Sequence, residues 1–306
     1  KQIRRSFSHL ATLETDNTMV QRLSMIFGEP GENSLNNIVS QFLNSFEDLS
    51  QNPTDLALRQ RTVTLGQTLL TRFKEISKQF EDTRNQISSD VYSNIDGANK
   101  LIREIADLNF KIASSNSKLE GDKQSLIDQR ATKIEELSKL IDINVTNGDF
   151  GTLNVFTNGI NLVTGSNYLQ LKAKESINSQ TGERSITLYK IDAKGRELST
   201  VNTQNGKIAS LIKHFNITFD NLDSSGGFSP ATSLETFFST FVQKVNNFTN
   251  QGYGLTDTTP PPPARNFFAV GTSIDIANTE INPSIANDVR LLPISANPGE
   301  VGDSTI

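Results

Sequence analysis

The stretch "FKEISKQFEDTRNQISSDVYSNIDGANKLIREIADLNFKI", Phe73 to Ile112, decides the fold because it reads as one unusually long helix. Its apolar residues recur every three or four positions, which is the spacing that keeps one face of a helix apolar. Such a seam is what a coiled-coil-like bundle needs, because each apolar step must keep facing its partner. The seam consists of Phe73, Ile76, Phe80, Ile87, Val91, Ile95, Ala98, Ile102, Ile105 and Ile112.

The helical pattern extends in both directions, from Asp55 to Ala113. A continuous helix of this size is about 90 Å long at 1.5 Å per residue. A compact globule of 306 residues is only about 50 Å across. The sequence therefore predicts an elongated helical rod, with Gly97 as its weak point because glycine costs about 1 kcal/mol relative to alanine in a helix.

A second helix precedes the long one, within "GENSLNNIVSQFLNSFEDLSQNP". Ser34 is its predicted N-cap. Asn52-Pro53 is predicted to start the long helix, with Asn52 as the cap and Pro53 at the first helical position. The apolar face comprises Leu35, Ile38, Val39, Phe42, Phe46 and Leu49.

A returning helix follows the long one. The polar "SSNSKLEGDK" predicts a turn with Asp122 as a helix cap, and "QSLIDQRATKIEELSKLI" is periodic again. A short polar connection between two periodic segments implies antiparallel neighbours. The expected buried stripe is Leu126 or Ile127, Ile134, Leu137 and Ile141.

After Ile141 the period changes from that of a helix to that of a strand. Apolar and polar residues alternate, and Asn147-Gly148 and Asn158-Gly159 interrupt the pattern. Asn-Gly favours the turns that match strand twist, so a run of hairpins is predicted. We place a small antiparallel β domain at residues 143–205.

The last third begins with "SLETFFSTFVQKVNNFTNQGYG", which predicts a helix, and continues through Pro260–Pro263 into short strands and turns. The fold class is accordingly α+β: residues 1–142 form the first part of the helical rod, 143–205 the β domain, and 206–306 complete the helical domain. The predicted buried stripe of this last helix is Leu234, Phe237, Phe238, Phe241, Val245 and Phe248.

Composition excludes several classes of function. A net charge of −5 disfavours a cationic nucleic-acid-binding face. The absence of cysteine excludes disulfides, thiolate metal sites and a cysteine nucleophile. No apolar run approaches the roughly 20 residues that cross a bilayer, and "KQIRRSFSHL" is not a secretory signal.

Candidate metal and catalytic sites are weak. His9 and His214 stand apart without a neighbouring ligand set or an evident partner, and "DNLDSSGG", 220–227, lacks the ligand spacing of a calcium loop. "GEPGE", 28–32, has acids and a proline where a phosphate cradle needs free N–H groups. Glu135 and Glu136 point about 100° apart on a helix, as solvated charges do. We expect no catalytic residue, no metal and no cofactor.

The cluster Asp128-Gln129-Arg130 lies in the returning helix. Catalysis would require a pocket, and packed helices offer little concavity. Two interpretations stay open, a solvated face and polar interlocking with another helix. Asn52, Arg59, Asp128, Gln129 and Arg130 are the candidates for interdomain or intersubunit contacts.

The order of segments resembles the bacterial flagellar hook-associated protein 1 family, whose members form the hook–filament junction. The resemblance spans Phe7 to Ala286, and its most specific parts are Asn52-Pro53 with Arg59 and Asp128-Gln129-Arg130. It rests on "IFGEPGENSLNNIVSQFLNSFEDLSQNPTDLALRQ", "IREIADLNFKI", "LIDQRATKIEELSKLIDINV", "GTLNVFTNGINLVTG", "GKIASLI", "KVNNFTNQGYG" and "NFFAV".

The resemblance implies a non-enzymatic structural subunit, secreted through the flagellar type III export apparatus and located in the flagellum, outside the cell or in the periplasm. Implied partners are copies of itself, hook protein and the next junction protein, without nucleic acid or membrane insertion. Family members also carry terminal helices and a C-terminal region that binds an export chaperone. These segments are not found in this sequence, so a fragment is expected.

Three alternatives stay open from sequence. Flagellin or another junction protein also combines helical and β domains. A surface adhesin would use the β domain for binding. A wall hydrolase would need two acids converging in a cleft, a pattern that the sequence does not contain.

Overall fold

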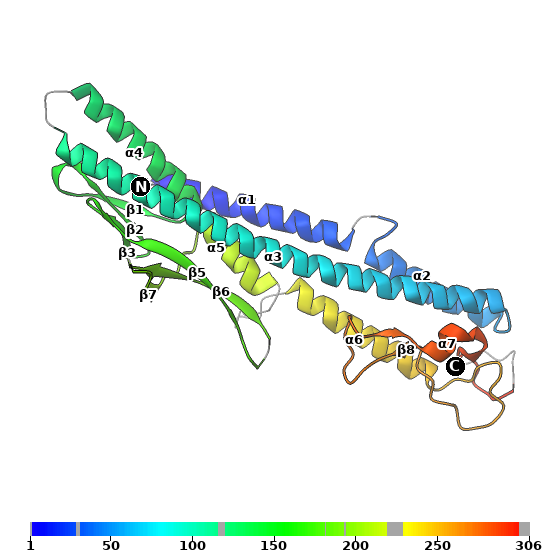
Figure 1. The fold of residues 1–306 in the computed structure, drawn as a ribbon. Coiled ribbons are helices and arrows are strands. Elements are labelled where there is room, and N and C mark those ends of the chain that lie inside the picture. Colours follow the sequence, from blue (N-terminus) through cyan, green and yellow to red (C-terminus); the bar gives the residue numbers. More distant parts are fainter. Residues whose placement is uncertain are drawn as a thin grey trace. The chain divides into compact units, whose positions relative to one another are not determined.

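The long helix exists and is unbroken. The computed structural model describes residues 2–28, 31–115, 120–180, 182–192, 194–218 and 229–299, and its helix α3 runs over Leu56–Ser114 (Figure 1). Its 59 residues correspond to about 88 Å of helix. All ten residues of the predicted seam are buried, and Gly97 lies inside the helix without interrupting it. The predicted long helix is confirmed, and its continuity at Gly97, which the sequence left open, is established by the structure.

The chain also contains shorter helices, most of which are labelled in Figure 1. They are α1 (Gln2–Phe27), α2 (Leu35–Gln51), α4 (Glu120–Leu140), α5 (Lys207–Lys213), the π-helix η2 (His214–Thr218), α6 (Pro230–Thr249) and α7 (Pro283–Asn287), with 3₁₀ turns η1 (Asp149–Gly151) and η3 (Val289–Leu291). Helix α1 is a feature that the sequence pattern did not predict. Its apolar residues are not confined to one face, since Met19 and Ile26 are buried whereas Leu10, Leu13 and Val20 are exposed.

Helix ends differ from the prediction at two places. Ser34 caps α2 as expected, accepting from the N–H of Asn37 at 3.3 Å. Asn52, however, ends α2 instead of starting α3, and the cap of α3 is Asp55, whose Oδ1 accepts from the N–H of Ala57 at 2.7 Å. Pro53 therefore lies in the turn between the two helices. Asp122 is not a cap, because α4 already begins at Glu120.

The strands form three antiparallel sheets (Figure 1). The first has the order β1-β2-β3-β4, the second β5-β6-β7, and the third pairs β8 with β9. Their bounds are β1 Asn144–Asn147, β2 Leu153–Thr157, β3 Ile160–Thr164, β4 Asn167–Tyr168, β5 Gln170–Ile177, β6 Arg184–Ile191, β7 Glu197–Thr200, β8 Phe268–Ala269 and β9 Glu280–Ile281.

One of the two Asn-Gly turns has the expected geometry. Asn158 and Gly159 both have positive φ, 43° and 79°, and join β2 to β3 directly. At Asn147-Gly148 the hairpin is wider. There the turn is made by Asp149–Gly151, where Phe150 and Gly151 take the positive φ values.

The chain packs into two compact units, and α3 contributes to both. The first unit comprises Lys1–Gln21 and Asp82–Ser229, and the second comprises Arg22–Glu81 and Pro230–Ile306. This division places the boundary within α3 and puts β1 to β7 in the same unit as α4. The boundaries 1–142, 143–205 and 206–306 stay a prediction.

The core of the second unit is an aromatic cluster between α2, α3, α6 and the segment at β8. Phe42 packs against Phe46, Phe241, Phe267 and Phe268 at centroid distances between 5.2 and 6.0 Å. Such ring pairs contribute about 0.5–1.5 kcal/mol each beyond the area they bury. The cluster explains why this segment of the chain returns to the early helices.

Helix α6 is rotated relative to its predicted buried stripe. Leu234 and Phe238 are buried as expected, but Phe237 and Phe248 are exposed. The buried face is completed by Val242, Asn246 and Thr249. The rotation follows from hydrogen bonds, because Asn246 and Thr249 must face the backbone of Phe267 and Phe268.

Candidate functional site

Arg130 is the buried member of the predicted polar cluster, and it joins three elements of the first unit. Its Nη1 donates to Oδ1 of Asn109 on α3 at 2.7 Å and to the carbonyl of Gly151, between β1 and β2, at 2.9 Å. The side chain is buried, and burial lowers the pKa of Arg130. Within the described residues Nε of Arg130 has no hydrogen-bond partner.

Asn109 completes this junction. Its Nδ2 donates to the carbonyls of Leu153 at 2.8 Å and Gly165 at 2.7 Å, and its Oδ1 accepts from the N–H of Leu153 at 3.1 Å. Together with Arg130 this uses both donors and the acceptor of the side-chain amide. Asn109 therefore attaches the first sheet to α3.

Asp128 and Gln129 point to solvent and bond within their own helix. Asp128 Oδ1 accepts from Gln124 at 2.9 Å, and Gln129 donates to Ser125 at 3.3 Å. The cluster thus divides: one residue organises the interior, and two lie on the surface. Gln129 also lines an open groove of about 360 Å³ between α3 and α4, which includes Glu104, Asp107 and Lys133.

Arg59 and Asn52 belong to the second unit. Arg59 is completely buried, and its Nε donates to the carbonyl of Pro53 at 2.7 Å while its Nη1 donates to the carbonyl of Leu292 at 2.7 Å. Burial lowers the pKa of Arg59 to about 10, which leaves the guanidinium charged at neutral pH. Asn52 is exposed, and its N–H donates to Leu49 at the end of α2. Arg59 therefore ties the α2–α3 turn to the chain segment after η3.

Four asparagines share one arrangement that sequence reasoning missed. In each, the side-chain amide pairs with both the N–H and the C=O of a single residue in a strand, as a neighbouring strand would. We call them the asparagine clamps. The pairs are Asn99 with Leu171, Asn109 with Leu153, Asn216 with Ile186, and Asn246 with Phe268.

The signal for one of these clamps was present in the sequence. Asn109 lies four residues after Ile105 and three before Ile112, so it occupies a position on the apolar seam. Asn246 gave no such signal, because its neighbours on the buried face of α6, Val242 and Thr249, also lie off the predicted stripe. A buried amide must find hydrogen bonds, so a clamp is the physical reason for a polar residue at such a position.

His214 has a partner that the sequence did not reveal. Its Nε2 lies 2.8 Å from Oδ1 of Asp16 on α1, and its Nδ1 lies 3.1 Å from Oγ1 of Thr218. Ser210 donates to the same oxygen of Asp16. Burial raises the pKa of Asp16, but the hydrogen bonds from Ser210 and His214 outweigh it and the net pKa is lowered.

This acid–imidazole–hydroxyl series does not offer a nucleophile to a substrate. Thr218 is 7% exposed, so its hydroxyl is enclosed. The contacts link α1 to the α5–η2 segment, which is a structural role. The sequence-based view that His214 lacks a recognisable partner was wrong because its partner lies 198 residues away.

Other candidate sites give little support for ligand chemistry. Among the described residues no group of three or more His, Cys, Asp or Glu side chains is placed to hold a metal ion. Across the same residues, no helix has the length and apolar character to span a membrane. The rejected calcium loop at 220–227 and residues 29–30 of "GEPGE" lie outside the described part of the chain.

The chain resembles characterised flagellar proteins in sequence. It is 26% identical over 249 residues to flagellar hook-associated protein 1 of Salmonella typhimurium, a match covering 80% of this chain and 42% of that protein. It is 25% identical over 266 residues to flagellar hook-associated protein 1 of Escherichia coli, covering 86% of this chain and 46% of that protein. The chain thus spans less than half the length of these relatives.

The fold also has a solved counterpart. The flagellar hook junction protein FlgK from Burkholderia pseudomallei matches with a TM-score of 0.70 at 22% identity, over 88% of this chain and 46% of that one. The model of the helical domain of flagellar hook-associated protein FlgK matches residues 20–268. Since that match covers most of the sequence, the chain belongs to the family of the FlgK helical domain.

Proposed function

We propose that the chain is part of a structural, non-enzymatic subunit of the bacterial flagellum at the hook–filament junction. The observation that carries the proposal is the family match over residues 20–268. The unbroken α3 and its asparagine clamps support the proposal. A helix that is shared by two units and hydrogen-bonded to the neighbouring sheets suits a part that bears mechanical load.

The partners in this proposal are copies of the same protein, hook protein and the next junction protein. Interfaces of such assemblies are built from side chains on the protein surface. Asp128, Gln129 and Asn52 are exposed and are our candidates for these contacts. Arg59 and Arg130 act indirectly, since they hold together the elements beneath the surface.

The location in this proposal is the flagellum outside the cytoplasmic membrane, reached through the flagellar type III export apparatus. An export chaperone is a further proposed partner, through the C-terminal region that binds it in the family. No cofactor is proposed.

Deletion of the gene for the parent protein tests the assignment. We expect cells with hooks but without filaments, flagellin shed into the medium, and loss of swimming that the intact gene restores. The measurements are electron microscopy of the hooks and detection of flagellin in the culture fluid. Normal filaments on the deletion strain would refute the assignment.

A further inference from the structure

Phe150 is an exposed aromatic side chain held in an unusual backbone conformation. It is 85% exposed and has a φ of 55°, in the turn between β1 and β2. A bulky residue in the left-handed region is uncommon, and such conformations persist where the surrounding structure holds them. An exposed, strained phenylalanine therefore calls for a physical reason.

The turn around Phe150 is rigidly supported. Arg130 donates to the carbonyl of Gly151 at 2.9 Å, and the N–H of Gly148 donates to the carbonyl of Thr152 at 2.9 Å. The hydroxyl of Thr152 donates to the carbonyl of Asp149 at 2.8 Å. A pre-organised aromatic group of this kind suits a protein interface, because aromatic residues are enriched at interface cores and little freedom is lost on binding.

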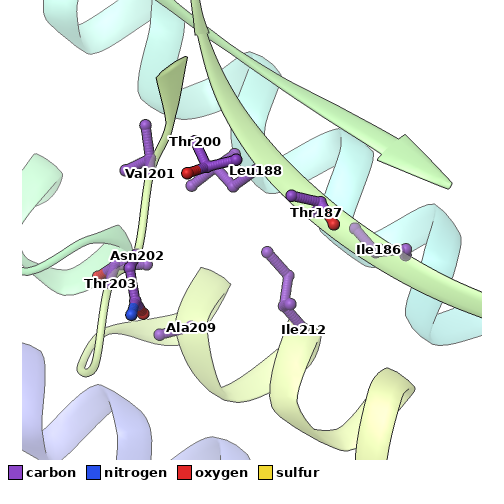
Figure 2. A pocket seen from close by; sticks show the side chains of 9 residues that line it. All are labelled: Ile186, Thr187, Leu188, Thr200, Val201, Asn202, Thr203, Ala209 and Ile212. Carbon is purple, nitrogen blue, oxygen red and sulfur yellow. The ribbon is translucent and has the colours of Figure 1, made fainter. Parts of the chain in front are cut away.

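The same unit carries a pocket suited to such an anchor. It lies between β6, the end of β7 and α5, and has a volume of about 210 Å³. Figure 2 shows Ile212 reaching from α5 toward β6, with Thr200 at the end of β7 and Asn202 on the segment between β7 and α5. The apolar lining consists of Ile186, Leu188, Val201, Ala209 and Ile212.

Phe150 cannot reach the pocket of its own chain. Gly151 lies against Ile112 on α3, whereas β6 begins at Arg184, whose carbonyl accepts from Arg84 on α3. From residue 84 to residue 112 the helix rises about 42 Å, at 1.5 Å for each of about 28 steps. The two to four residues from Arg184 to the pocket recover at most about 14 Å.

Charge favours contact between the two surfaces. Asp149 is exposed beside Phe150, and the turn Gly148–Thr152 contains no basic residue. Helix α5 carries Lys207 and Lys213, both exposed, and no acid. Lys213 lies next to the pocket residue Ile212, and its charge also acts on Asp16 of α1.

We propose that Phe150 of one copy occupies the pocket of a second copy, head to tail. We call Phe150 and its turn the knob. Because the knob and the pocket are different surfaces, every pair of copies still has one unoccupied knob and one unoccupied pocket, so the contact extends into an array. The inference rests on the proposed assembly role and adds the surfaces through which copies meet.

Cross-linking tests this contact cleanly, since the chain contains no cysteine. Asn147→Cys lies beside the knob and Thr200→Cys at the pocket, and both native side chains are exposed. A short bis-maleimide reagent on the concentrated double variant should give a ladder of trimers and larger species on a denaturing gel. Each single-cysteine variant should stop at a dimer.

Phe150→Ser added to the double variant should reduce the ladder at least about tenfold, the loss expected for an anchor residue. Phe110→Ser is the matched control, because Phe110 is also an exposed phenylalanine of the first unit, and it should leave the ladder unchanged. The absence of species above the dimer, or a ladder that survives Phe150→Ser, would overturn the contact. Either result would leave the deletion phenotype untouched, so this inference and the proposed function fail separately.

Discussion

At the scale of single residues, the first unit depends on a few buried polar groups, of which Asn109 has the most contacts. Asn109→Ala would leave the N–H and C=O of Leu153, the carbonyl of Gly165 and Nη1 of Arg130 with fewer partners. Leaving buried polar groups unpaired costs about 1–3 kcal/mol each. We expect a loss of about 2–4 kcal/mol in the free energy of unfolding, measured by urea denaturation followed by circular dichroism.

Asn94→Ala is the matched control for this change. Asn94 lies on the same helix, and its side chain donates to the carbonyl of Asp90 one turn earlier. A loss below about 0.5 kcal/mol is expected there, because Asn94 is half-buried and its hydrogen bond stays within its own helix. Equal losses for Asn94→Ala and Asn109→Ala would contradict the importance of the clamp.

Asp16 predicts a pH dependence at the contact of α1 with the α5–η2 segment. The pKa of Asp16 is lowered in the folded protein, so the unfolded state binds the proton more readily in acid. The contribution of Asp16 to stability is therefore complete above the ordinary aspartate pKa and disappears as the pH falls through the lower folded value. We expect the stability advantage of the wild type over Asp16→Asn to shrink between pH 5 and pH 2.5.

The size of that advantage is at most about 1 kcal/mol, because the group is partly exposed. Unfolding free energies of the two proteins across the acid range measure it. An advantage that stays constant down to pH 2.5 would exclude Asp16 as the titrating group.

Sequence reasoning identified Arg130 and Arg59 as polar residues of interest, but not what they touch. Their acceptors are mostly backbone carbonyls, and a carbonyl carries no mark in a sequence. Asn109 was overlooked because an isolated amide in a helical pattern resembles a surface residue. The helical spacing does place Asn109 on the apolar seam, and this position is what indicates that its side chain is buried.

At the scale of elements, two glycines of α3 should respond oppositely to the same substitution. A Cβ at Gly97 would meet Leu140 at 3.8 Å, which is an ordinary contact. A Cβ at Gly66 would come within 2.7 Å of the ring of Phe267 in the aromatic cluster. Gly97→Ala should therefore stabilise by about 0.5–1 kcal/mol, and Gly66→Ala should destabilise by about 1–3 kcal/mol.

Thermal unfolding of the two variants beside the wild type measures both effects. The pair controls for helix propensity, because both changes replace glycine by alanine inside the same helix. Stabilisation by Gly66→Ala would mean that Phe267 moves aside freely. Destabilisation by Gly97→Ala would mean that α3 needs the flexibility of glycine at that position.

Elements were more predictable than their ends and faces. Long helices such as α3 and α4 can be predicted from apolar spacing, because the periodic pattern repeats over many residues. Asn52-Pro53 shows the limit, since asparagine before proline fits both the end of one helix and the start of the next. The rotation of α6 was unpredictable for a different reason: its face is chosen by hydrogen bonds to a strand 22 residues later.

At the scale of the whole molecule, the chain leaves each unit and returns to it. The first unit combines Lys1–Gln21 with Asp82–Ser229, and the second combines Arg22–Glu81 with Pro230–Ile306. A sequence read in order suggests consecutive domains, because pairing between distant segments leaves little local signal. Family resemblance supplied the idea of a returning chain, whereas periodicity did not.

The division into two units predicts separate responses to the loss of a clamp in each. Asn109→Ala should speed amide hydrogen exchange in β1 to β4 and in α4, because these elements meet at Asn109 and Arg130. Asn246→Ala should speed exchange in α6 and around Phe268, whose N–H and C=O lose their partner. Mass spectrometry of exchanged peptides locates both effects.

Hydrogen exchange in α3 is the decisive measurement, because this helix belongs to both units. Residues 56–81 should follow Asn246→Ala, and residues 82–114 should follow Asn109→Ala. If both variants instead accelerate amide hydrogen exchange equally along all of α3, the chain opens as one cooperative body. A boundary near Glu81 and Asp82 would instead show that one continuous helix can belong to two separately stable structures.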